Sequence, residues 1–211
     1  MQSSSTFWDG MAKKYSQSAI RDMDGYVATL DRTRGYLRPT DRALELGCGT
    51  GGTARELAPS VDHITGTDIS SKMIEIALAR GGEAGITNAN YVVAGADATP
   101  SDAPFDVVMA HNLVHLLPDA KRAIDHIGSL VKPGGLFISK TPCLAQPGLS
   151  LKLRLIVKAI PILQMFNKAP YVCLLTSKAL ESMISDAGFT LIESGFHPAS
   201  SISCYIVARR N

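Results

Sequence analysis

A glycine-rich segment that follows an apolar stretch limits the folds open to this chain more than any other feature. Residues 43–46 are mostly apolar, and the segment after them, Gly47-Cys48-Gly49-Thr50-Gly51-Gly52, leads into a helix-like stretch that ends at Pro59. Glycine allows a sharp turn and a close approach of a ligand to the backbone. The first turn of a helix has free N–H groups. The segment therefore predicts a strand, a nucleotide-binding turn and a helix at the carboxyl edge of a parallel sheet.

The spacing of these glycines leaves alternatives open. The order Gly-x-Gly-x-Gly differs from the Gly-x-Gly-x-x-Gly of a pyrophosphate-binding loop. A glycine-rich turn that binds no ligand is the simplest alternative. The choice between them depends on the residues further along the chain.

Composition indicates a single domain over residues 1–211. The hydrophobic share of 45% and the charged share of 19% are those of a soluble globular protein, and a net charge of +2 does not favour a nucleic-acid partner. Residues 1–5 lack the basic segment and apolar run of a secretory signal, so a cytoplasmic location is expected. The scattered cysteines predict free thiols and no metal site; they are Cys48, Cys143, Cys173 and Cys204.

The order of strand-like and helix-like segments predicts an α/β fold. The expected strands cover residues 43–46, 63–69, 90–98, 105–110, 136–140, 189–196 and 202–208. Helices are expected at 53–58, 70–80, 118–131 and 177–187, with a turn at 132–135. We also expect an N-terminal helical cap over residues 1–39 and a helical insert over residues 144–175. The short connection between the last two strands, His197–Ser201, excludes a parallel crossover, so the last strand should be antiparallel.

Two acidic residues follow expected strands. Asp68 lies 19 residues after Gly49, close to the interval of about 20 at which an acid meets a ribose in nucleotide-binding folds. A carboxylate suits this task because it can accept hydrogen bonds from both hydroxyls of a diol. A helix cap or a solvated acid is the alternative for Asp68. Asp97 closes the third expected strand in the same way.

Five motifs in this order resemble those of class I S-adenosylmethionine-dependent methyltransferases of the small-molecule type. They are Glu45–Gly51, Asp68–Ser70 with Met73, Gly95–Ala98, Phe105–Val108 leading to Asn112–His115, and Leu130–Leu136. The resemblance is close over residues 40–140. It implies a Rossmann-like, doubly wound sheet of seven strands, with S-adenosylmethionine as cofactor and S-adenosylhomocysteine as product.

The resemblance also implies a set of cofactor contacts. The glycine loop would approach the methionine part, Asp68 would hold the ribose diol, and Asp97 would accept from the adenine amino group. The expected contacts are Gly47, Cys48, Gly49, Asp68, Ile69, Met73, Ala96, Asp97, Ala98, His111 and Asn112. In the N-terminal cap, Tyr15 would close over the ligand, and Asp9 is expected to cap a helix.

Methyl transfer from a sulfonium requires few catalytic side chains because the donor is already activated. Alignment of acceptor, methyl carbon and sulfur can supply roughly 7–11 kcal/mol in intramolecular models. A general base is needed only if the acceptor keeps a proton. His111 is the candidate base, while Tyr15 could position the acceptor or contact the sulfonium through its ring. His115 is expected to pack in the interior.

The expected insert is both apolar and basic. Residues 149–166 are mostly apolar, and no acid occurs between His126 and Leu180. Three charges and Pro161 argue against a membrane span. One interpretation is a buried helix whose lysines reach outward. The other is an apolar lid over the substrate, which could make weak contact with an anionic membrane surface through residues 144–170.

These observations favour a methyltransferase that acts on a small, apolar or amphipathic acceptor. Residues 110–113 lack the Asn/Asp-Pro-Pro-Tyr motif of enzymes that methylate nucleic acids or protein amides. A protein that binds S-adenosylmethionine without turnover is one alternative. A nicotinamide-dependent reductase is another, disfavoured by the glycine spacing, by Asp97 and by the absence of a Tyr-x-x-x-Lys pair.

Overall fold

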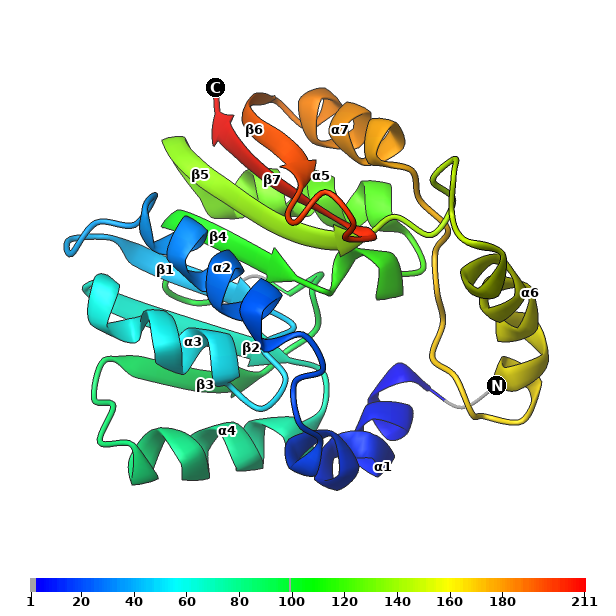
Figure 1. Cartoon of the computed structure of the whole chain (residues 1–211). Coiled ribbons are helices and arrows are strands. Elements are labelled where there is room, and N and C mark those ends of the chain that lie inside the picture. The colour runs from blue at the N-terminus through cyan, green and yellow to red at the C-terminus, as the bar shows by residue number, and fades with distance from the viewer. Residues whose placement is uncertain (1–2, 99) are drawn as a thin grey trace.

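The fold is built on one mixed β-sheet (Figure 1). The computed structural model describes residues 3–98 and 100–211; Met1 and Gln2, part of the segment considered for a secretory signal, and Thr99 lie outside the described residues. The strands are β1 (Arg42–Leu46), β2 (His63–Asp68), β3 (Ala89–Val93), β4 (Phe105–His111), β5 (Val131–Pro142), β6 (Phe189–Phe196) and β7 (Ser203–Arg210).

In the described part of the chain, all the α-helices except Gly52–Leu57, whose N-cap is Gly51, begin after residues whose side chains accept hydrogen bonds from the first turn. Ser70, Asp119 and Thr176 act in this way. The helices are α1 (Ser4–Gln17), α2 (Met23–Arg34), α3 (Gly52–Leu57), α4 (Ser71–Glu83), α5 (Ala120–Leu130), α6 (Leu151–Met165) and α7 (Ser177–Asp186), with short 3-10 turns η1 (Ala58–Ser60) and η2 (Val114–Leu116).

The strand order confirms the predicted fold class. Across the described part of the chain the seven strands lie in the order β3-β2-β1-β4-β5-β7-β6. The pairs among β1 to β5 are parallel, and β7 runs antiparallel to both β5 and β6. The direction of winding reverses between β1 and β4, which are neighbours in the sheet. In such sheets a ligand binds outside the carboxyl ends of the strands at this reversal.

A hydrophobic core lies on each face of the sheet. On one face, Ile124 of α5 and Leu180 of α7 pack against buried strand residues. On the other face, Leu30 of α2, Leu57 of α3 and Ile74 of α4 do the same. Figure 1 shows these two helical layers, with α6 standing apart from both. The sheet is therefore covered on both sides, as a doubly wound fold requires.

The end of β3 and the start of β5 differ most from the boundaries expected from the sequence. β3 ends at Val93, so Asp97 lies in a turn beyond the strand; the intervening small residues 94–96 have a weak strand preference. Residues 132–135 are part of β5 instead of a separate turn. Gly134 has a positive φ of 77° there, and the register against β4 shifts.

The N-terminal helices do not form a single cap, which corrects the expectation for residues 1–39. α2 packs on the sheet, with Leu30 in the core and the Thr33 hydroxyl 3.2 Å from the Tyr205 hydroxyl. α1 instead packs against α4 (Figure 1). Of these two N-terminal helices, α1 therefore lies outside the helical layers and α2 belongs to one of them.

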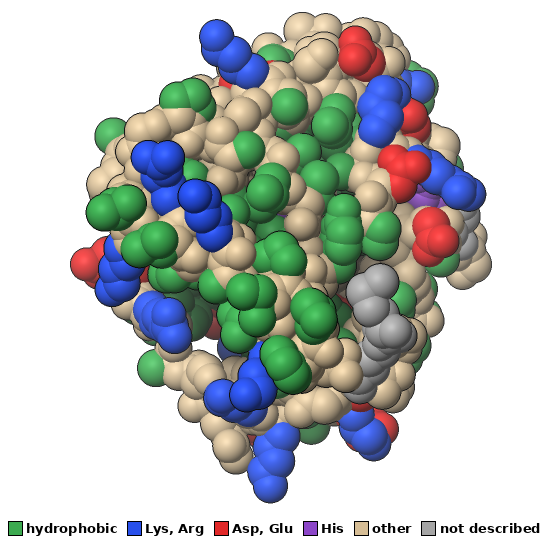
Figure 2. All heavy atoms as spheres, turned by 90° about the vertical axis from the view of Figure 1, so that its right-hand side faces the viewer, with side chains coloured by type: hydrophobic (Ala, Val, Ile, Leu, Met, Phe, Trp, Pro, Cys, Tyr) green, Lys and Arg blue, Asp and Glu red, His purple; other side chains and the backbone are tan. Residues whose placement is uncertain are grey.

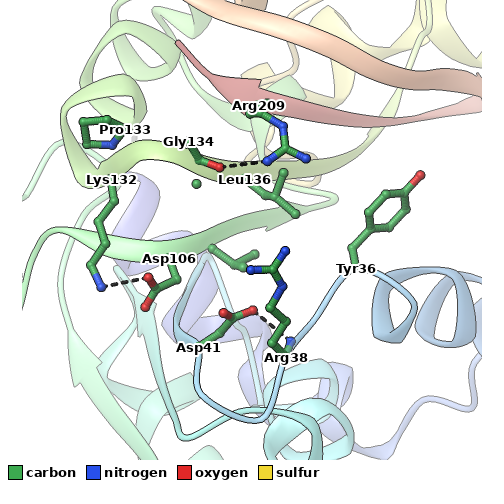
Figure 3. A pocket seen from close by; sticks show the side chains of 11 residues that line it. Tyr36, Arg38, Asp41, Asp106, Lys132, Pro133, Gly134, Leu136 and Arg209 are labelled. Carbon is green, nitrogen blue, oxygen red and sulfur yellow. Dashed lines mark hydrogen bonds and ion pairs between the residues drawn. The ribbon is translucent and has the colours of Figure 1, made fainter.

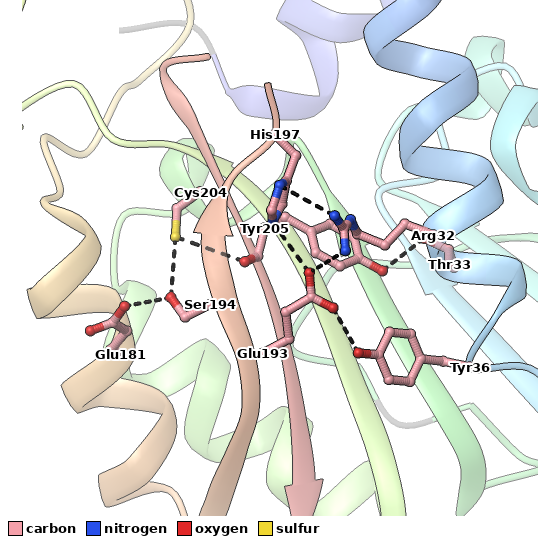
Figure 4. A network of polar contacts seen from close by, with 9 residues as sticks. All are labelled: Arg32, Thr33, Tyr36, Glu181, Glu193, Ser194, His197, Cys204 and Tyr205. Carbon is pink, nitrogen blue, oxygen red and sulfur yellow. Dashed lines mark hydrogen bonds and ion pairs between the residues drawn. The ribbon is translucent and has the colours of Figure 1, made fainter. Parts of the chain in front are cut away.

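A polar network fixes α2 against the far edge of the sheet (Figure 4). The Tyr36 hydroxyl donates to the Glu193 carboxylate of β6 at 2.6 Å. A guanidinium nitrogen of Arg32 lies 2.9 Å from the same carboxylate, and Nε2 of His197 lies 3.2 Å from it. The Glu193 carboxylate therefore contacts Arg32 and Tyr36, in and just after α2, and also His197, just after β6.

Replacement of Glu193 by alanine should lower the free energy of unfolding by about 2 kcal/mol, because its three partners lose their common acceptor. In a chain of this size the midpoint of thermal unfolding would fall by roughly 4–8 °C. The matched control is Glu75→Ala, which removes an exposed pair with Lys72 and should have little effect. Equal shifts in the two variants would show that the network does not hold α2.

Candidate functional site

The glycine loop turns at the carboxyl end of β1. Gly47, Gly49 and Gly51 have positive φ angles of 65°, 54° and 72°, a region that favours glycine. A Cβ atom on Gly47 would lie 2.7 Å from Cδ1 of Leu113, so packing excludes a side chain there. A Cβ atom on Gly49 would meet only the Tyr15 ring, at 3.8 Å. The backbone at Gly49 is thus open to a close ligand.

Asp68, the last residue of β2, faces this loop as the sequence predicts. Its Oδ2 accepts a hydrogen bond from the Gly49 N–H at 2.9 Å, and its Oδ1 accepts one from the Ser70 N–H at 2.9 Å. Burial raises the pKa of this carboxyl, although the two N–H donors act in the opposite direction. Each oxygen keeps a second lone pair with which to accept from a ligand hydroxyl.

Asp9 connects α1 to this site. Its Oδ1 accepts from the Ser70 hydroxyl at 2.6 Å and from the Lys72 N–H at 3.2 Å, and the Ser70 bond is the main reason that the pKa of Asp9 is lowered. Ser3 is the N-cap of α1 and Ser70 is the N-cap of α4. Asp9 lies inside α1 and is therefore not the N-cap of either helix; it accepts hydrogen bonds from the start of α4 instead. The α1 helix is anchored next to Asp68 by this contact.

The Tyr15 ring lies next to the glycine loop, 3.8 Å from the position of a Cβ atom on Gly49; its closure over a ligand stays a prediction. Burial, followed by the carboxylates of Glu45 and Asp68, raises its pKa. The phenol therefore stays protonated at neutral pH and can donate a hydrogen bond, which argues against a role as base. The Arg80 side chain further fixes the end of α1 by donating to the Ser16 carbonyl at 2.7 Å and to the Thr50 hydroxyl at 3.2 Å.

Glu45 is a site residue that the sequence-based assignment missed. Its side chain is 3% exposed and that of His111 is 7% exposed, with 3.8 Å between Glu45 Oε1 and His111 Nδ1. Within residues 3–98 and 100–211, Glu45 Oε2 and both ring nitrogens of His111 have no hydrogen-bond partner. Buried polar groups are normally paired, so these atoms are suited to hold a polar ligand group. The available signal was an acid among the apolar residues Ala43, Leu44 and Leu46 of β1.

Two further residues considered in the sequence analysis, Asn112 and His115, lie just after the carboxyl end of β4. Asn112 is exposed, has a positive φ of 56° and donates its N–H to the Lys140 carbonyl at 2.7 Å. Burial lowers the pKa of His115 to about 4. His115 is therefore neutral at physiological pH, in keeping with the packing role predicted for it.

The remaining predicted contacts differ in their exposure. Asp97 and Ile69 are exposed beyond the ends of β3 and β2. Ala96 and Ala98 are partly exposed in the turn that contains Asp97. By contrast, the side chains of Cys48 and Met73 are buried, and Cys48 belongs to the core under α3 and α4. These two reach a ligand least directly. The assignment of all the predicted residues as cofactor contacts stays a prediction.

A separate cavity of about 270 Å³ lies at the other end of the central strands, away from the glycine loop (Figure 3). Its charged groups are largely satisfied within the protein: Lys132 Nζ lies 2.8 Å from Asp106 Oδ1, and Asp41 accepts from the Arg38 N–H at 2.8 Å. The cavity adjoins the amino ends of the central strands. It is therefore distinct from the glycine-loop site, which has the position expected of a ligand site in this topology.

The strand order and the pairing of Asp68 with the glycine loop match what the resemblance to class I S-adenosylmethionine-dependent methyltransferases implies. A family model described as a methyltransferase domain matches residues 17–194. The chain therefore belongs to the methyltransferase-domain family, whose cofactor is S-adenosylmethionine. With the family shown, the nicotinamide-dependent alternative is set aside.

Curated relatives support this family assignment. The 27-O-demethylrifamycin SV methyltransferase of Amycolatopsis mediterranei is 33% identical over 133 residues, which cover 61% of this chain and 47% of that protein. The ubiquinone biosynthesis O-methyltransferase of Xylella fastidiosa is 34% identical over 100 residues, covering 46% of this chain and 41% of that protein. The chain thus spans less than half the length of these relatives.

Solved structures agree on the fold. Magnesium protoporphyrin IX methyltransferase from Synechocystis PCC 6803, solved with bound S-adenosylhomocysteine, aligns with a TM-score of 0.73 at 20% identity and covers 99% of this chain and 96% of that chain. At this level of identity the likeness concerns the fold.

The residues present fit S-adenosylmethionine, which carries an ammonium group, a sulfonium and a ribose diol. Glu45 supplies a buried carboxylate with an unpartnered oxygen, which suits the ammonium. Asp68 supplies acceptors for the diol, and the open backbone at Gly49 permits close approach. Burial, followed by the carboxylates of Glu45 and Asp68, raises the pKa values of Tyr15 and Cys48. The carboxylate contribution indicates a negative environment, which favours a cationic ligand.

Proposed function

We propose that this protein transfers a methyl group from S-adenosylmethionine to a small, apolar or amphipathic acceptor in the cytoplasm, without a nucleic-acid partner. The main support is the arrangement of Glu45 and Asp68 on either side of the glycine loop. Two relatives also have names that fit such an acceptor, one for 27-O-demethylrifamycin SV and one for an O-methyl transfer in ubiquinone biosynthesis.

An aromatic-lined cavity supports the apolar acceptor. It measures about 80 Å³ and lies between α1, η2 and the segment that follows α6. Phe7, Trp8 and Tyr171 are among its lining residues, together with Leu116. Aromatic and aliphatic walls of this kind favour an acceptor with an apolar body. The cavity holds part of such a molecule, since sites for small ligands usually measure about 300 Å³ or more.

In the proposed reaction the protein binds and orients the methyl donor and the acceptor, and it excludes water from the site. When bound, S-adenosylmethionine supplies an electrophilic methyl group on a cationic sulfur. The glycine loop and Asp68 hold the adenosyl part, and Glu45 holds the amino group. Tyr15, on α1, lies next to the loop and is 54% exposed, so it would cover the ligand once the ligand is bound. Alignment of this kind can provide most of the rate enhancement.

His111 has a defined place in this proposal. If the acceptor keeps a proton, Nε2 of His111 would take it, and Glu45, 3.8 Å from Nδ1, would stabilise the imidazolium. The ring is buried here, so an acceptor would reach it only after a shift of the covering segments. The role as base therefore requires a test separate from that of cofactor binding.

His111→Ala should reduce turnover by roughly 100-fold or more if His111 is the base, and should change the affinity for S-adenosylhomocysteine far less. Steady-state kinetics and calorimetry measure the two effects. Equal losses in turnover and affinity, or no loss in either, would remove His111 as the base.

A screen of small acceptors with methyl-labelled S-adenosylmethionine tests the proposed activity. We expect label to pass to an apolar phenol, alcohol or amine. Glu45→Gln, which should bind the methyl donor more weakly, is the reference with reduced transfer at low donor concentration. Binding of S-adenosylmethionine with no labelled product from a broad acceptor set would favour the non-catalytic sensor.

A further inference from the structure

The α6 helix, within the insert predicted over residues 144–175, is not the buried helix that one interpretation of the sequence expected. None of its residues is buried. Figure 1 shows it to one side of the sheet and its two helical layers. Leu153, Val157, Ile160 and Gln164 are partly covered, and their spacing places them on the inner side of the helix. The rest of its surface faces away from the protein.

The outer side of α6 is apolar. Leu151, Leu155, Ile162 and Phe166 are 70%, 59%, 60% and 68% exposed. At 3.6 residues per turn they fall within an arc of about 60°. Helices of soluble proteins normally turn such a stripe toward a core. This stripe faces solvent, so it is suited to contact with an apolar phase outside the protein.

The same segment is strongly basic. Lys152, Arg154, Lys158 and Lys168 lie in or just after α6, and no acid occurs between Asp125 and Glu181. In the described part of the chain, none of these four cations forms an ion pair; the pairs present join other residues. Figure 2 shows hydrophobic and basic side chains together on this side of the molecule.

We propose that the outer side of α6 docks on the surface of an anionic lipid bilayer. The apolar stripe would enter the boundary between headgroups and acyl chains, and the four cations would contact the lipid phosphates. Long lysine and arginine stems allow both contacts from one helix. A second copy of this chain fits less well, because two such basic surfaces would repel each other.

The docked helix would lie in the plane of the interface. In residues 3–98 and 100–211 no helix has the length and apolarity needed to cross a bilayer. Pro161 inside α6 removes one backbone hydrogen bond, which an interfacial helix tolerates. The segment after α6 also lines the aromatic cavity, through Asn167, Pro170 and Tyr171. If the proposed activity holds, docking would place this cavity beside a source of apolar acceptors.

Sedimentation of the full chain with vesicles tests this proposal. We expect retention on vesicles of phosphatidylcholine mixed with phosphatidylglycerol, and weak retention on phosphatidylcholine alone. Lys152→Glu combined with Lys158→Glu should reduce binding by roughly 25-fold or more, since each cation near an anionic surface contributes about fivefold. Leu155→Ser combined with Ile162→Ser should reduce it by about tenfold or more. All four side chains are exposed, so folding should be unaffected.

Matched controls come from exposed residues on other helices. Arg122→Glu on α5 changes charge as the lysine variants do, and Leu78→Ser on α4, where Leu78 is 52% exposed, changes exposed apolar area. Both controls should bind vesicles like the unaltered protein. Failure of the unaltered chain to bind anionic vesicles would overturn the proposal, as would equal losses in the controls.

Light scattering tests the alternative that a second copy of the chain, and not a bilayer, covers the outer side of α6. If the α6 substitutions convert a dimer into a monomer and leave vesicle binding unchanged, the docking proposal is wrong. Vesicle binding is measured without a methyl donor, so its failure is distinct from a failure of the methyl-transfer proposal.

Discussion

Asp68→Ala should weaken the binding of S-adenosylhomocysteine by about 100-fold or more. The substitution removes the acceptor of the Gly49 and Ser70 N–H groups, which now bond to Asp68 at 2.9 Å. It also removes the expected acceptor for the ribose hydroxyls. Hydrogen bonds to a charged group contribute about 1.5–3 kcal/mol each, and loss of two such bonds accounts for this change. Isothermal titration calorimetry measures it.

Asp125→Ala is the matched control for this experiment. Asp125 is an exposed acid on α5 that pairs with Lys121, so its loss should leave the affinity unchanged. Circular dichroism shows whether the Asp68 variant keeps its fold. A folded Asp68→Ala protein that binds as tightly as the control would contradict the role of Asp68.

Glu45→Gln should lower the affinity for S-adenosylhomocysteine by about 10- to 100-fold, because a charged partner of the ligand's amino group becomes neutral. Methylthioadenosine, which has no amino-acid part, should bind equally well to this variant and to the unaltered protein. Asp68→Ala should instead weaken both ligands. Calorimetry with the two ligands therefore assigns each carboxylate to one end of the cofactor.

One outcome of the comparison between the two ligands would contradict the proposed contact of Glu45 with the amino group. If Glu45→Gln weakens methylthioadenosine as much as S-adenosylhomocysteine, Glu45 acts on the loop as a whole and not on the amino group. Glutamine has nearly the same size as glutamate, so a change in packing is a minor concern. An unchanged midpoint of thermal unfolding in the ligand-free variant would confirm that the packing is kept.

The sequence predicted those features that local patterns encode. The apolar strands, the positive-φ glycines and the acid at the end of β2 all follow from residues that are near one another in the chain. The short connection after β6 likewise excluded a parallel last strand. Asp68 was found because its distance along the chain from Gly49 reflects one strand–helix–strand unit.

Features that depend on distant segments could not be obtained in this way. Asp9 accepts a hydrogen bond from the hydroxyl of Ser70, about sixty residues later, and α2 packs on the sheet through contacts with β6 and β7. Periodicity alone did not show which side of α6 faces the protein, since apolar residues occur all around that helix. The role of Glu45 becomes visible only when β4 places His111 beside it.

A crystal structure with S-adenosylhomocysteine tests the central claim most directly. We expect the adenosyl group at the carboxyl ends of β1 and β2, with the ribose hydroxyls on the Asp68 carboxylate and the amino group within reach of Glu45. Density for the ligand in the cavity beside Arg38 and Lys132, or at any site away from the glycine loop, would contradict the account.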